Sequence, residues 1–325
     1  MHQVRPRFVA ERPGLDPERD LAPLSLQASA RFHLTDGHVW GLDEALVPTT
    51  SRGILMPAGA KLLNATHDLR LVVADAGELL ILDGPAQHEI PIAHADSATF
   101  MGDDHLLVTA PDVYQVVSGS RTIDARGEHH AYLVHLPTAS IVERVRLDLD
   151  DAGVLAVPHP TDGSVLLDGG MGQDGSRVFA ARVTDGHLEV EHVFENRCVG
   201  SFSPTGSHLL LTPHPSFDHN PEVVHWPTTR LLASIDPDRA GLDDDAFGLY
   251  GTVVGDDRIV LMTFESGLLL CTGDLEPVGH LDLGEFDDTQ DDEIASICAL
   301  GGGHLGVVVM SDRTARTTVW DLRGV

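Results

Sequence analysis

Lysine is nearly missing from the sequence: Lys61 is the only one among 325 residues, and the other twenty cationic side chains are arginine. Acidic residues outnumber basic ones by 50 to 21, which gives a formal net charge of −29 at pH 7. A surface this negative repels the phosphate backbone of nucleic acids and anionic lipid headgroups. We therefore expect neither nucleic acid nor a membrane surface among the partners of this chain.

Cysteine is scarce, and hydrophobic runs are short. Cys198, Cys271 and Cys298 are odd in number and form no Cys-x-x-Cys pair, which excludes a zinc site built on cysteine and favours buried free thiols. No apolar run approaches the 18 residues of a membrane helix, and the first twenty residues lack the charged-then-apolar pattern of a secretory signal. We expect a cytoplasmic protein.

Helix signals are almost absent, because apolar residues rarely recur at the i, i+3, i+4 and i+7 spacing. Apolar bursts of four to seven residues are separated instead by Gly, Pro, Asp and Thr, which is typical of an all-β repeat protein. A tight polar turn followed by a strand recurs at 102–110, 204–213, 255–264 and 301–310. One position after the turn is equivalent in these copies, and it holds His105, His208, Arg258 and His304. The recurrence indicates a scaffold role for the histidines.

A second strand and an outer strand follow most of these turns, which predicts four-stranded antiparallel units. Each unit is too small to bury its own faces, so it must stack on its neighbours. Six units follow residue 60, and residues 24–57 supply a seventh. The last unit ends at Val325 after its third strand, and we expect Pro6–Glu11 to provide the fourth. Pairing of the two termini would remove the exposed edges of an open array.

Two segments resemble the repeats of the WD-type β-propeller family. They are 198–236, with the run CVGSFSPTGSHLLLTP, and 294–322, which ends in Val319-Trp320-Asp321-Leu322. The resemblance implies a single seven-bladed β-propeller over 1–325, with residues 1–23 as an N-terminal segment that contains the closing strand. The expected blades are 24–60, 61–93, 94–150, 151–195, 196–240, 245–285, and 292–325 together with 5–11. Because that family is mostly non-enzymatic, the resemblance also implies a scaffold or binding role.

The long segments of the sequence fall on one side of such a propeller. In each blade the first-to-second and third-to-fourth strand turns lie on one face, and the other connections lie on the opposite face. The long, irregular segments belong to the second class, at 110–130, 168–176, 212–221, 236–246 and 284–293. Loops tolerate additions and concentrate binding groups, so this face is predicted to be the working face.

Histidine and acidic residues gather in these segments. The candidate residues are the four histidines His129, His130, His214 and His219, together with Asp218. The acids predicted to form a binding face are Asp243, Asp244, Asp287, Asp288, Asp291 and Asp292. Solvated loops are the ordinary role for such residues. Neither the acidic run 243–245 nor the run 287–293 has the D-x-D-x-D-G order of a calcium loop. We therefore expect these acidic segments to attract a basic protein or peptide partner.

A divalent metal is the one cofactor that the sequence suggests. Zinc takes three or four ligands and favours neutral imidazole, so His129, His130, His214 and His219 are candidate ligands if the two loops converge. The chain has 19 histidines, and exposed histidines on loops are the alternative interpretation. No nucleotide is expected: Gly170–Gly175 matches G-x-G-x-x-G, but a strand pattern follows it where a helix is required.

Two functional hypotheses follow. The favoured one is a binding module that docks a protein or peptide partner on the working face, and a small-molecule ligand remains an alternative. The second is a propeller enzyme, a lyase, cyclase or hydrolase acting on a small molecule. Its acid–base or metal chemistry would use the histidines above and Asp218 at the mouth of the channel.

Overall fold

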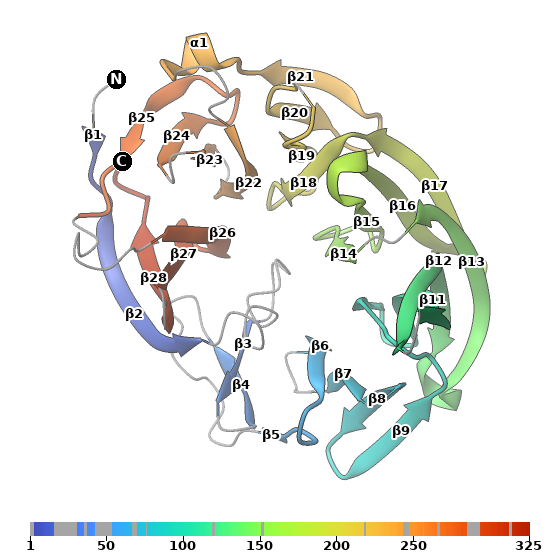
Figure 1. Cartoon of the computed structure of the whole chain (residues 1–325). Helices are drawn as coiled ribbons and strands as arrows, with labels where there is room; N and C mark the ends of the chain where they lie inside the picture. The colour runs from blue at the N-terminus through green and yellow to red at the C-terminus, as the bar shows by residue number, and fades with distance from the viewer. Residues whose placement is uncertain are drawn as a thin grey trace.

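The computed structural model describes residues 3–15, 31–35, 38–42, 54–66, 70–75, 77–118, 121–150, 153–217, 219–242, 247–255, 257–264, 267–284, 293–311 and 314–325. These residues form seven sheets arranged in a ring around a central axis (Figure 1). The chain is therefore a seven-bladed β-propeller, as the repeat pattern predicts. Among the described residues, no helix is both long and apolar enough to cross a membrane.

Each blade is built from consecutive strands, with the first strand nearest the centre of the ring and the last at its rim. Blade 1 holds β3 (Arg31–Thr35), β4 (His38–Leu42) and β5 (Ile54–Leu55). Blade 2 holds β6 (Lys61–Ala65), β7 (Leu71–Asp75), β8 (Glu78–Asp83) and β9 (Ala86–Ile90). Blade 3 holds β10 (Ser97–Met101), β11 (His105–Ser118), β12 (Arg121–His135) and β13 (Ser140–Asp150), with the 3₁₀ turn η2 (Leu136–Thr138).

Blades 4 to 7 follow the same order. Blade 4 holds β14 (Gly153–Pro158), β15 (Val165–Gly170), η3 (Gly172–Asp174), β16 (Ser176–Thr184) and β17 (His187–Glu195). Blade 5 holds β18 (Arg197–Phe202), β19 (His208–Pro213), β20 (Glu222–His225), β21 (Arg230–Ser234) and the short α1 (Pro237–Ala240). Blade 6 holds β22 (Phe247–Val254), β23 (Arg258–Thr263), β24 (Leu268–Thr272) and β25 (Pro277–Leu281). Blade 7 holds β26 (Glu293–Gly301), β27 (His304–Ser311) and β28 (Thr314–Asp321).

The N-terminal segment closes the ring. β2 (Arg7–Leu15) pairs antiparallel with β28, so the predicted closing strand is confirmed and extends four residues beyond Glu11. The Phe8 ring meets the Trp320 ring at 5.3 Å between centroids. The sequence did not predict β1 (Gln3–Val4), which pairs parallel with β25 at the rim of blade 6. The N-terminal segment therefore joins the outer edges of two blades.

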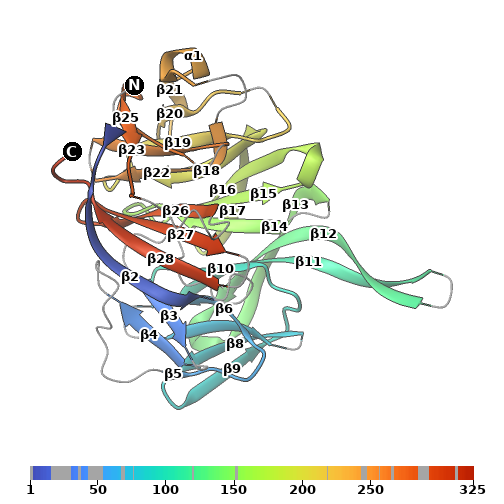
Figure 2. The ribbon, with the colours of Figure 1, turned by 60° about the vertical axis from the view of Figure 1, so that its left-hand side comes forward.

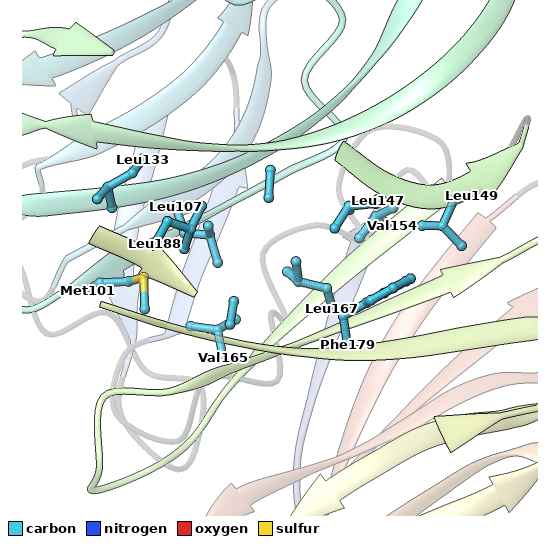
Figure 3. Close-up of a cluster of buried hydrophobic side chains, with 12 residues drawn as sticks. Met101, Leu107, Leu133, Leu147, Leu149, Val154, Val165, Leu167, Phe179 and Leu188 are labelled. Atoms are coloured by element: carbon cyan, nitrogen blue, oxygen red, sulfur yellow. The ribbon is translucent and has the colours of Figure 1, made fainter. Parts of the chain in front are cut away.

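Apolar clusters between neighbouring sheets hold the blades together. Figure 3 shows the cluster between blades 3 and 4, which contains Leu107 and Leu133 of blade 3 and Leu167 and Phe179 of blade 4. The opposite face of blade 3 packs on blade 2, and Val108 belongs to that second cluster. Because both faces of a blade are buried, the second and third strands read as continuous apolar runs rather than as alternating ones.

Polar side chains link the strands of neighbouring blades. Asn64 Nδ2 donates to the Ala98 carbonyl at 2.7 Å, between blades 2 and 3. The Val253 amide donates to Ser201 Oγ at 2.8 Å, between blades 5 and 6, and the Ala299 amide donates to Thr252 Oγ1 at 3.0 Å, between blades 6 and 7. Each bond satisfies a buried polar group that a purely apolar interface would leave unpaired. The links therefore fix the register of one blade against the next.

The segment 110–130 differs from the irregular loop that the sequence predicted. β11 and β12 continue through it as a long hairpin, which projects from the ring on the predicted working face (Figure 2). β13 pairs with β12 only from Glu128 onward, so the outer part of the hairpin has two strands. Interruptions of the register between Pro111 and Val113 and between Glu128 and His129 mark the place where the hairpin leaves the blade.

Candidate functional site

The loop face is the face that carries the second-to-third strand connections and the connections between blades. Besides the β11–β12 hairpin, it holds η3, residues 214–217 and 219–221, α1 and the start of β22. The opposite face, here the turn face, carries the short turns. The histidines predicted to form a site lie on the loop face, in blades 3 and 5.

His129 is fully buried at the base of the hairpin, where it forms an ionic cluster with two other residues. Its Nε2 lies 2.7 Å from Asp96 Oδ2, and Arg126 Nη2 lies 2.7 Å from both oxygens of the same carboxylate. Burial alone would raise the pKa of Asp96, but hydrogen bonds from His129 and Arg126, together with the charge of Arg126, hold it below its usual range. The cluster ties the chain before β10 to the hairpin base, and His129 itself is closed to ligands.

His130 points to the opposite side of β12, because neighbouring residues of a strand alternate between its faces. Arg144 Nη2 lies 3.0 Å and 3.1 Å from the two ring nitrogens of His130 and 2.8 Å from Asp112 Oδ1. The guanidinium also lies over the Tyr132 ring, 5.5 Å from its centroid. Burial first, and the charge of Arg144 second, lower the pKa of His130. His129 and His130 are thus parts of two separate clusters.

One group of side chains in the described part of the chain has the spacing of a metal site: Asp112, Glu128 and His130 each place a ligand atom within 4.8 Å of the others. However, Arg144 pairs with Asp112, and Arg146 Nη2 lies 2.9 Å from Glu128. Two guanidinium groups therefore already balance the two carboxylates, and a divalent cation would have to displace them. The group fits a metal poorly.

His214 and His219 belong to blade 5 and pack around Phe217. The Ser216 amide donates to His214 Nδ1 at 3.2 Å, and the Phe217 ring stacks on the His219 ring at 6.2 Å between centroids. Burial lowers the pKa of His214, against the opposing effect of a hydrogen bond to the backbone of Gly172. His214 thereby links this segment to η3 of blade 4. Within the residues that the structure describes, it does not join the blade 3 histidines in one centre.

The remaining predicted site residues cannot be placed. Asp218, Asp243, Asp244, Asp287, Asp288, Asp291 and Asp292 lie outside the described residues.

Exposed apolar side chains on the loop face are a feature that the sequence did not reveal. On the hairpin they are Tyr114, Val116 and Val117, the last with 74% of its surface exposed. In blade 6 they are Leu249, Tyr250 and Phe264, the last 61% exposed. The run Val113-Tyr114-Gln115-Val116-Val117 belongs to the 14-residue strand β11, within the segment 110–130 that the sequence predicts to be irregular. Tyr114, Val116 and Val117 gather on one hairpin, and apolar groups gathered in solvent mark interaction surfaces.

Asp168 is a carboxylate held between blades 4 and 5. The Val199 amide donates to its Oδ2 at 2.7 Å, and Cys198 lies beside it. Burial raises the pKa of Asp168 to about 6, against the smaller effect of that hydrogen bond. None of the three cysteines forms a disulfide, as predicted, and burial raises the pKa of Cys198 and Cys271 to about 12. These thiols are protonated at neutral pH and suit packing rather than nucleophilic chemistry.

Asp168→Asn is expected to raise the melting temperature at pH 8. The pKa of Asp168 in the folded state lies above its usual value near 3.8. Its protonated form therefore contributes its full stability below pH 3.8, and this contribution is lost as the pH rises through about 6 and the buried carboxyl ionises. An amide keeps the bond to Val199 without the buried charge, and the gain should be about 1–3 kcal/mol. Thermal melts between pH 4 and 8 measure it. Asp174→Asn, at an exposed site in η3, is the control, and equal melting of both variants and the wild type at pH 8 would contradict this assignment.

The turn face repeats one local design. The strand after each turn begins at His105, His208, Arg258 and His304, as the sequence predicted. Two third-to-fourth strand turns are near copies: His135 Nδ1 lies 2.7 Å from Thr138 Oγ1, and His225 Nδ1 lies 2.8 Å from Thr228 Oγ1. A cleft of about 560 Å³ lies between blades 6 and 7, but Arg258 and Arg323 on its wall already bond to Asp257 and Asp321. These contacts support the structural role expected of this face.

Comparisons with known proteins identify the architecture only. No family model matches the sequence, and no curated protein matches it. A solved structure similar to this chain is BamB from Moraxella catarrhalis, with a TM-score of 0.50 over 91% of this chain and 80% of that one. The two sequences are 14% identical. Similarity at this level shows the fold alone, so the chain has a β-propeller fold that BamB shares.

Proposed function

We propose that this protein is a binding module that docks a protein or peptide partner on its loop face. The single observation that supports this most is the β11–β12 hairpin, which holds Tyr114, Val116 and Val117 in solvent away from the ring. A two-stranded ribbon is only marginally stable by itself, so apolar side chains at its end gain most from a second surface that covers them.

The hairpin is well anchored where it leaves the ring. Arg126 and His129 bind Asp96 from one side, and Arg144 binds Asp112 from the other. Because these contacts lie on two faces of the hairpin base, they fix the direction of the projection. A pre-oriented ribbon loses little conformational freedom when a partner binds, and this favours affinity.

The net charge of −29 supports a basic partner. A strongly negative surface speeds the approach of a positive one, and this steering weakens as salt screens it. The second hypothesis from the sequence, an enzyme at the channel mouth, gains no support from the described histidines. His129 is fully buried, and His214 is buried against η3 and Phe217.

Removal of the hairpin is expected to abolish partner binding while the ring stays folded. In the variant, Asn-Gly replaces residues 112–127, so that Pro111 and Glu128 are joined by a tight turn. Quantitative affinity capture from cell extract at 50 and 300 mM salt should recover basic proteins with the wild type, more weakly at high salt, and should lose them at least tenfold with the variant.

Val142→Ser is the matched control, because Val142 is also exposed and apolar but lies on β13 at the rim of the same blade. Its capture profile should equal that of the wild type. Equal recovery by the hairpin-deleted chain, or recovery that ignores salt, would refute the proposed function.

A further inference from the structure

The hairpin has an edge of unpaired backbone. β10 pairs with β11 only between His105 and Thr109, and beyond that point β11 pairs with β12 alone. Pairs that exchange hydrogen bonds alternate along an antiparallel ladder, so every second residue of the projecting part directs its N–H and C=O groups away from β12. From 111 to 117, the described chain therefore presents a strand edge that no other strand covers.

The outer part of this edge, from Val113 onward, lacks the features that normally block pairing with another chain; Pro111, Asp112 and the interrupted register lie only at its base. Proteins protect exposed edges with charged side chains, prolines or covering segments. The outer strand β13 carries Glu143, Arg144 and Arg146, and β17 carries Glu189 and Glu191. Residues 113–118 hold no charged residue and no proline. The contrast between β11 and the charged edge strands β13 and β17 points to a site that is kept open.

We propose that the free edge of β11 receives an extended, basic segment of the partner as an additional β-strand. The inference rests on the proposed function, because it names how the loop face takes hold of its partner. Main-chain hydrogen bonds would supply affinity, and side chains would alternate between the two faces of the ribbon. Tyr114 and Val116 lie on one face, and Val113 and Val117 lie on the other, so each face offers apolar contact.

The partner is basic, and it is not a second copy of this chain. Two copies would each bring a net charge of −29 to the contact. A basic segment gains from the same field that repels a copy, and its Lys or Arg side chains can lie over the half-exposed Tyr114 ring.

The probe that tests this proposal is a peptide selected from a random twelve-residue phage library on the immobilised full-length chain. We expect enriched sequences in which apolar residues alternate with Lys or Arg. N-methylation of alternate peptide amides should weaken binding at least tenfold for one set of positions and less than twofold for the other, because only one set faces β11. Amide exchange of residues 112–118 should slow when the peptide is bound.

Three variants separate the possible outcomes. Val113→Lys/Val117→Lys places charge on the free edge and should reduce peptide binding at least tenfold, while Val142→Ser should leave it unchanged. If only Phe264→Ser loses peptide binding, and N-methylation has the same effect at every position, strand addition is wrong. The proposal of a binding module on the loop face would then still hold. Equal binding to all three variants, or no enriched peptide, would overturn both proposals. Sedimentation that shows a dimer of the wild type, lost in the lysine variant, would assign the edge to a second copy.

Discussion

A chain that lacks residues 1–12 is expected to be less stable by about 5 kcal/mol or more, because the ring then opens. The deletion removes β1 and most of β2, and with them the outermost strand of blade 7 and the strand added to blade 6. It also removes the ring contact of Phe8 with Trp320 and the 2.6 Å hydrogen bond from Arg7 Nη2 to Asp321. An uncovered strand edge and newly exposed apolar surface both favour unfolding and aggregation. Thermal and urea unfolding, followed by tryptophan fluorescence, measures the loss.

A synthetic peptide of residues 1–15 provides the control. If the loss is caused by the missing strand, the peptide should pair with β28 when added in excess and should raise the melting temperature of the truncated chain. A peptide with Phe8→Ala should restore less, because the ring contact with Trp320 is absent. Unchanged melting of the truncated chain would show that the terminal strands do not hold the ring closed.

Gly200→Ala is expected to destabilise the protein by about 3 kcal/mol. A methyl group at Gly200 would lie 2.8 Å from the carbonyl oxygen of Gly251, which belongs to the innermost strand of the next blade. The obstacle is backbone, so no side-chain rotation relieves the contact, and blades 5 and 6 must move apart. Because Ser201 Oγ accepts from the Val253 amide and lies 3.4 Å from Thr252 Oγ1 at the same level, the shift would also disturb these contacts between blades 5 and 6.

Gly153→Ala is the matched control. Gly153 begins β14, the innermost strand of blade 4, and a Cβ there meets no atom within 4 Å. This change should leave stability the same or raise it by up to about 1 kcal/mol, because alanine restricts the unfolded chain. Urea unfolding of both variants compares them directly. Equal stabilities would show that the close approach of β18 and β22 is not required.

The ring gives the projecting hairpin a fixed base. Both faces of blade 3 are buried in apolar clusters with blades 2 and 4, so β11 and β12 leave a fixed base. The clusters of Asp96 and Asp112 then set the direction of exit. A partner strand that pairs with the free edge would thus dock at a defined distance and angle from the ring.

The sequence by itself determined the architecture, because its signals are local and repeated. The runs after each tight turn, such as His208–Pro213, are apolar on both faces and fix which strands lie inside a blade. The missing fourth strand at the C-terminus identified 5–11 as the closing strand, since an open edge must be covered. Neither conclusion required knowledge of which residues meet across the ring.

Only the tertiary structure decided which residues of the loop face are free to act. Whether a histidine lies in solvent or beneath a neighbouring blade depends on non-local packing, so His129 and His130, although adjacent in sequence, face opposite clusters. The sequence did not predict the projecting hairpin for a related reason. Strand patterns predict where a strand forms, but β10 begins only at Ser97 and β13 ends at Asp150, and this leaves the outer parts of β11 and β12 without further strand neighbours. The projecting hairpin arises from strand lengths that differ within one blade, and that difference exists only in the folded sheet.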